Sequence, residues 1–114
     1  MLEGLLDDIS KNPGIHSSGI FDKNGLLICS KGSHNNLETM VSTMQGLIEK
    51  NNNTFHSLNI DPINCITLIG ETGTSLFWPL KKSAALGIMV KVETNLGEIR
   101  RVVTPLLQRI EDLI

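Results

Sequence analysis

The sequence predicts an α+β sandwich in which helices cover both faces of one five-stranded antiparallel sheet. Three segments carry apolar side chains at helical spacing, and five shorter segments have the composition of strands. Short segments join most of the strands, so strands that follow one another should pair antiparallel. The strand over 84–92 is almost wholly apolar, which is typical of a strand covered on both faces. The expected order is α-β-β-α-β-β-β-α, within a single domain over 1–114.

The first half of the chain contains a short helix, a hairpin and a longer helix. The apolar side chains of the short helix are Leu2, Leu5, Leu6 and Ile9. The NPG sequence at 12–14 ends this helix. Strands over 15–21 and 26–31 follow, and the DKNG sequence at 22–25 joins them. Asn and Gly tolerate positive φ and Asp bonds its own turn backbone, so this segment indicates a tight hairpin and not a phosphate-binding loop.

The central helix is predicted from an apolar stripe with i, i+3, i+4, i+7 spacing. Its members are Leu37, Met40, Val41, Met44, Leu47 and Ile48. The asparagines at 51–53 weaken the helix pattern, and the stripe could also extend to Phe55 and Leu58, so the end of this helix is left open. The Asp61-Pro62 sequence ends whatever precedes it.

The second half predicts three strands and a closing helix. Strands over 63–70 and 75–80 precede the apolar strand, with short joining segments. The closing helix begins at Asn95, because Asn95 and Glu98 have the spacing of a capping box. Pro105 interrupts this helix, and a kink is expected there because the apolar stripe continues past it.

Composition and charge exclude several classes of function. The formal net charge is −2, so no basic surface dominates, and nucleic acid is not the expected partner. No apolar run approaches the roughly 20 residues that span a bilayer, so no direct membrane insertion is expected. Met1 leads directly into an amphipathic pattern without a signal-peptide profile. Both cysteines lie in apolar strands. The expected location is therefore the cytoplasm, with reduced cysteines.

No group of residues in the sequence has the spacing of a catalytic or metal site. The histidines His16, His34 and His56 are far apart and have no ligand spacing with the cysteines. The glycine-rich turns join strands and lack the lysine of a phosphate loop. We therefore expect no catalytic residue, no metal and no cofactor, and no enzymatic activity.

Two stretches resemble one known family. The entry LLDDISKNPGIHSSGIFDKNGLLICSKG and the closing LGIMVKVETNLGEIRRVVTPLLQRIEDLI resemble the Roadblock family, which includes dynein-associated light chains. The resemblance covers nearly the whole chain and rests on the order of elements and a few glycines. It implies a Roadblock/profilin-like sandwich, a non-enzymatic role, and a dimer formed by pairing third strands and packing central helices side by side. It also implies a platform for small Ras-like GTPases.

Mapped onto this sequence, the resemblance implies a dimer interface and a partner-binding flank. The interface comprises Leu37, Met40, Val41, Met44, Ile48, Asn64, Ile66 and Leu68, and joins the chain to itself or to a sister Roadblock chain. The flank that would bind the GTPase comprises Glu38, Ser42, Gln45 and Glu49. Two alternatives stay open: the methionines could be plain core, and the domain could be a small-ligand sensor of the PAS or GAF kind, with a pocket between sheet and helix.

Overall fold

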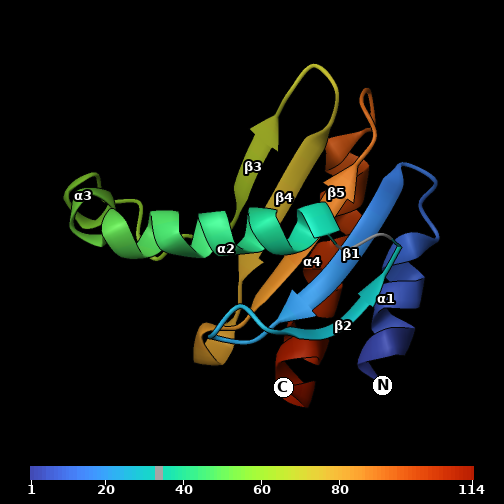
Figure 1. Cartoon of the computed structure of the whole chain (residues 1–114), viewed down its shortest axis with the longest axis horizontal. Coiled ribbons are helices and arrows are strands. Elements are labelled where there is room, and N and C mark those ends of the chain that lie inside the picture. The colour runs from blue at the N-terminus through green and yellow to red at the C-terminus, as the bar shows by residue number, and fades with distance from the viewer. Residues whose placement is uncertain (33–34) are drawn as a thin grey trace.

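The computed structural model describes residues 1–32 and 35–114, and shows one antiparallel sheet between two helical layers (Figure 1). The strands lie in the order β2-β1-β5-β4-β3, so β2 and β3 are the two edges. Helix α2 crosses one face of the sheet, while α1 and α4 cover the other. The predicted fold class and order of elements are confirmed. The elements are α1 (Leu2–Ser10), β1 (Ile15–Phe21), β2 (Leu27–Lys31), α2 (Asn35–Lys50), α3 (Asn52–Ser57), β3 (Ile66–Ile69), β4 (Thr74–Pro79), the 3-10 turn η1 (Lys81–Ser83), β5 (Ala85–Val90) and α4 (Leu96–Leu113).

The larger core lies between the sheet and the layer of α1 and α4. Helix α1 contributes its predicted apolar face, and α4 contributes the buried side chains of Ile99, Val103 and Ile110. The central strand β5 is buried along almost its whole length, as its apolar sequence predicts. Burying each such side chain contributes about 1.5–3 kcal/mol before the entropy of ordering it is subtracted.

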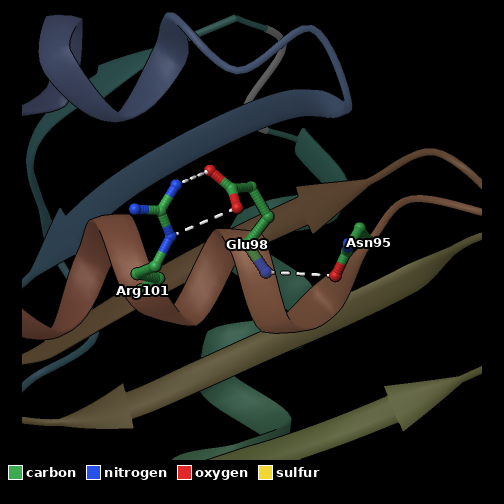
Figure 2. Close-up of polar contacts among 3 residues, drawn as sticks. All are labelled: Asn95, Glu98 and Arg101. Atoms are coloured by element: carbon green, nitrogen blue, oxygen red, sulfur yellow. Dashed lines mark hydrogen bonds and ion pairs between the residues drawn. The ribbon is translucent and has the colours of Figure 1, made fainter.

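Helix α4 begins with a side-chain cap, which Figure 2 shows. Asn95 Oδ1 accepts a hydrogen bond from the backbone N–H of Glu98 at 3.1 Å, so half of the predicted capping box forms. The Glu98 carboxylate does not reach back to Asn95, because it accepts hydrogen bonds from Arg101 one turn further on. The helix continues without a break through Pro105.

Helix α2 packs unusually close to the sheet, over a pair of glycines. Gly19 of β1 and Gly87 of β5 are register partners. A Cβ placed on Gly87 would lie 2.6 Å from Val41 Cγ2, and one on Gly19 would lie 2.8 Å from Leu37 Cδ2. Real Cβ atoms do not approach other heavy atoms so closely, so only glycine at these two positions lets α2 pack this close to the sheet. This close packing leaves no ligand-sized space beneath the first half of α2, where a sensor domain would hold its ligand.

The structure corrects the bounds of one predicted strand, fixes the end of the central helix that the sequence left open, and adds two bulges. Strand β3 covers only Ile66–Ile69, so the predicted strand over 63–70 was too long and Asn64 lies outside it. The central helix ends at Lys50, and 52–57 forms the separate helix α3. Register shifts show an extra residue at His16 in β1 and at Ile28 in β2. Apolar composition predicts that strands exist but not where their pairing stops, which explains these differences.

Candidate protein-interaction surface

Strand β3 forms an edge of the sheet that no other part of the described chain covers. Its backbone pairs with β4 on one side only. The side chains of Leu68 and Ile69 are 49% and 74% exposed, on opposite faces. No charged residue interrupts the segment from Ile63 to Gly70. An apolar edge of this kind is a template for another strand.

The turn after β3 determines which backbone groups point outward. The N–H of Gly70 donates to the carbonyl of Gly73 at 2.9 Å. Hydrogen-bonded pairs alternate along an antiparallel ladder, so Leu68 and Ile66 also point their backbone groups toward β4. Thr67 and Ile69 therefore direct their N–H and C=O groups away from the sheet. These two residues, and not Ile66 or Leu68, carry the free hydrogen-bonding groups of the edge.

Helix α2 is longer than the sheet beneath it requires. Leu37 lies over Gly19 of β1, and three strand spacings, about 14 Å, separate β1 from β3. The fourteen residues from Leu37 to Lys50 span about 20 Å of helix. The end of α2, with α3 after it, therefore projects beyond β3 (Figure 1). Helix α3 has no buried residue, and Leu58 and Ile60 after it are 61% and 51% exposed.

Most of the predicted helix interface is already buried within one chain. Leu37, Met40, Val41 and Met44 pack against the sheet, together with Phe21 and Phe77. The open alternative, that the methionines are core residues, is what their burial supports. Ile48 is half-buried and packs at the margin of the same cluster. A second helix beside α2 would have to contact other side chains, because these four have little surface left.

The predicted partner-binding flank is mostly exposed, but its members differ. Glu38, Ser42 and Glu49 are exposed, whereas Gln45 is half-buried and donates from Nε2 to the backbone oxygen of Asp22 at 3.4 Å. This hydrogen bond ties the middle of α2 to the β1–β2 turn. Beside Gln45 and Glu49 lies a groove of about 240 Å³ between α2 and η1, whose apolar lining includes Ile48 and Pro79.

Few polar side chains elsewhere are positioned for chemistry. Arg100 Nη2 donates to Thr67 Oγ1 at 2.9 Å, which fixes β3 against α4. Burial raises the pKa of the Cys29 thiol, and the nearby Glu3 carboxylate adds to this, so both effects disfavour the reactive thiolate. Among residues 1–32 and 35–114, no cluster of His, Cys, Asp and Glu has the geometry of a metal site. Within the same ranges, no helix is long and apolar enough to cross a membrane.

Comparison with solved structures identifies the architecture. No family model matches the chain, and no curated protein matches it significantly. Solved structures match closely in shape. MglB of Myxococcus xanthus superposes with a TM-score of 0.81 at 17% identity, over 96% of this chain and 91% of that one. A Roadblock/LC7 domain from Streptomyces avermitilis gives 0.82 at 10% identity, over 96% and 94%. The chain has a Roadblock-type fold.

The fold of the chain is also similar to that of profilins. LokiProfilin2, solved in complex with rabbit actin, gives a TM-score of 0.64 at 13% identity over 99% of this chain. The resemblance read from the sequence is thus confirmed at the level of fold. The sequence analysis missed Thr67, Ile69, Leu58 and Ile60 of the exposed edge and overhang. The GETG turn at 70–73 was the available signal for Thr67 and Ile69, because the turn determines which alternate residues of β3 form hydrogen bonds with β4.

Proposed function

We propose that the chain is a non-enzymatic scaffold that pairs with a second copy, or with a sister chain, along β3. The observation that carries this proposal is the uncovered edge of β3, where Thr67 and Ile69 direct unpaired backbone groups outward. Each unpaired group at an apolar edge favours addition of another strand. A second β3 would continue the sheet across both chains and cover the exposed side chains of Leu68 and Ile69.

The opposite edge of the sheet is protected against such pairing. Strand β2 carries an extra residue at Ile28, which twists an edge and interrupts its ladder. Its last residue, Lys31, donates to Asp7 of α1 at 2.7 Å, and this contact raises the pKa of Lys31. A bulge and a charged residue are common devices for keeping an edge single. Strand β3 has neither, so the two edges favour one dimer through β3 and not an open chain of copies.

The overhang of α2 and α3 supports the same arrangement. A chain paired at β3 would lie directly beneath the segment that projects past this edge. The exposed Leu58 and Ile60 would then meet apolar surface of the partner, which would stabilise the dimer. One structural neighbour is described as MglB with a tetrameric arrangement, so a chain of this fold does assemble with its own copies.

A proline at Ile69 tests the strand pairing. Ile69→Pro removes an N–H that faces outward and leaves the hydrogen bonds between β3 and β4 intact. Light scattering at micromolar concentration should give twice the chain mass for wild type and the monomer mass for Ile69→Pro. Circular dichroism should show that the variant remains folded. Ile69→Ala, the control, keeps the N–H and should remain largely dimeric. A folded Ile69→Pro variant that is fully dimeric would refute pairing through this edge.

We further propose that the outer face of α2 in this dimer binds a small Ras-like GTPase. The proposal rests on the Roadblock-type fold and on the exposed positions Ser42 and Glu49, next to the apolar groove at Ile48. Glu49→Lys should weaken binding mainly through the association rate, with a changed salt dependence. The control is Glu3→Lys on α1, on the other side of the sheet. Equal affinities and salt slopes for Glu49→Lys and wild type would place the partner elsewhere.

We expect the chain to lack nucleotide hydrolysis, and this expectation can be tested directly. Purified protein incubated with GTP or ATP and magnesium should release no phosphate above buffer, because neither glycine-rich turn has the sequence of a phosphate loop. Turnover that persists through further purification would contradict the scaffold proposal.

A further inference from the structure

A bowl in the surface lies where β1 begins and β5 ends, beside the first turn of α2. Its volume is about 380 Å³, within the size range of small-molecule sites. The polar groups that line it include His16, Ser17, Asn36 and Lys91, and Met89 and Val92 give it an apolar side. It lies beside the opposite end of α2 from the groove at Ile48 and from the overhang.

The bulge in β1 brings two consecutive side chains into this bowl. Ile15 pairs with Val90 and Ser17 pairs with Met89, so His16 is the extra residue. Without a bulge, His16 and Ser17 would point to opposite faces. Ile15 packs in the core beneath α1 and α4, whereas Ser17 has the same orientation as Gly19 under α2. Bulges often re-aim a side chain next to a functional site.

Ser17 has a hydroxyl that nothing in the described part of the chain satisfies. The residue is only 2% exposed, yet no hydrogen bond joins its hydroxyl to another residue of 1–32 or 35–114. Among the described residues, Ser18 Oγ is the one enclosed polar side-chain atom without a partner, so the Ser17 hydroxyl, which also lacks one, keeps access to solvent through the bowl. A hydroxyl that lines a bowl and lacks a partner is well placed to bind a ligand.

The charges around the bowl favour an anion. Lys91 lines it, and none of its lining residues is acidic. Asn36 belongs to the first turn of the sixteen-residue helix α2, whose N-terminal N–H groups and dipole attract negative charge. The acidic residues nearest in sequence, Glu38, Glu71 and Glu93, are exposed and do not line the bowl.

We propose that this bowl binds a small organic molecule through its phosphate group. The phosphate oxygens would accept hydrogen bonds from Ser17, Lys91 and the first turn of α2, and the organic part would pack on Met89 and Val92. The site does not involve the β3 edge, so a test of phosphate binding is independent of the test of the proposed dimer.

The probe is phenyl phosphate, and its binding to the full chain is monitored by amide NMR at constant ionic strength. Saturable changes in amide chemical shift should concentrate at Ser17, Asn36 and Lys91. Inorganic phosphate should cause the same shifts at higher concentration, since it lacks the apolar part. Neutral benzyl alcohol should cause none of them. Equal effects of phenyl phosphate and benzyl alcohol, or shifts spread evenly over all surface lysines, would overturn the proposal.

Two pairs of variants complete the test. Ser17→Ala should weaken phenyl phosphate binding about three- to tenfold, the range for one hydrogen bond. Ser18→Ala is the matched control, because Ser18 is equally buried and unpartnered among the described residues but points to the opposite face. Lys91→Gln should weaken binding about five- to tenfold, and Lys81→Gln should not. Unchanged affinity in both Ser17→Ala and Lys91→Gln would refute the site.

Discussion

Replacing Gly87 with alanine tests how closely α2 packs on the sheet. The new Cβ would lie 2.6 Å from Val41 Cγ2 and 3.1 Å from Met40 Cε. Met40 is flexible and can move aside. Val41 cannot, because a β-branched side chain in a helix has one strongly preferred rotamer. The helix itself must therefore shift away from β5.

The expected loss of stability follows from two opposing effects. Removing a glycine stabilises a protein by about 0.4–1 kcal/mol through the unfolded chain. Overpacking a well-packed core destabilises it by about 1–3 kcal/mol. We expect a net loss of about 1–2 kcal/mol for Gly87→Ala, which lowers Tm by about 4–8 °C for a chain of this size.

Thermal unfolding at one fixed protein concentration measures this effect, because a dimer makes Tm depend on concentration. Gly4→Ala is the matched control: Gly4 lies in α1, and a Cβ there would have no neighbour within 4 Å. It should raise stability by up to about 1 kcal/mol. Adding Val41→Ala to Gly87→Ala should recover about 0.5 kcal/mol or more beyond additivity, since it removes the clashing methyl group. A Gly87→Ala variant at least as stable as Gly4→Ala would refute the close packing.

Two further predictions concern α4 and the cysteine of β2. Asn95→Ala should cost about 1 kcal/mol in urea unfolding because it removes the helix cap, whereas Asn95→Asp should cost little; equal losses would contradict a capping role. Cys29 should react with iodoacetamide more slowly than free cysteine near neutral pH, because burial raises the pKa of its thiol. Since the folded pKa is raised, the contribution of Cys29 to stability is complete below the ordinary thiol pKa of about 8.5 and is lost as pH rises through the folded pKa. Mass spectrometry of the alkylated protein from pH 7 to 10 would measure the alkylation rate of Cys29. A rate equal to that of free cysteine would contradict the raised thiol pKa.

The sequence predicted the layers of the fold because hydrophobic periodicity reports burial directly. Most of the stripe of the central helix became core, and the apolar run over 84–92 is buried on both faces of the sheet as far as residue 90. Periodicity could not show that the first four members of the α2 stripe are used within one chain while Leu47 stays exposed. The same apolar spacing serves a core and a helix–helix interface equally well. The glycine pair at 19 and 87 was visible in the sequence, but its meaning depends on strand register, which brings the two residues together.

The edge of β3 shows why an interaction site is harder to predict than a core. Side chains alternate between the two faces of a sheet, while backbone groups alternate between its two neighbouring strands. An apolar side chain at Leu68 therefore says nothing about which residue can bond a partner strand. The residues that can bond a partner strand depend on which alternate positions of β3 already bond β4. The hydrogen bond between Gly70 and Gly73 fixes this alternation and leaves the backbone groups of Thr67 and Ile69 free. The overhang of α2 depends in turn on where the helix starts above β1. Both features arise from relations between elements, so single-segment patterns cannot contain them, and only the assembled sheet distinguishes an edge that is open from one that is closed.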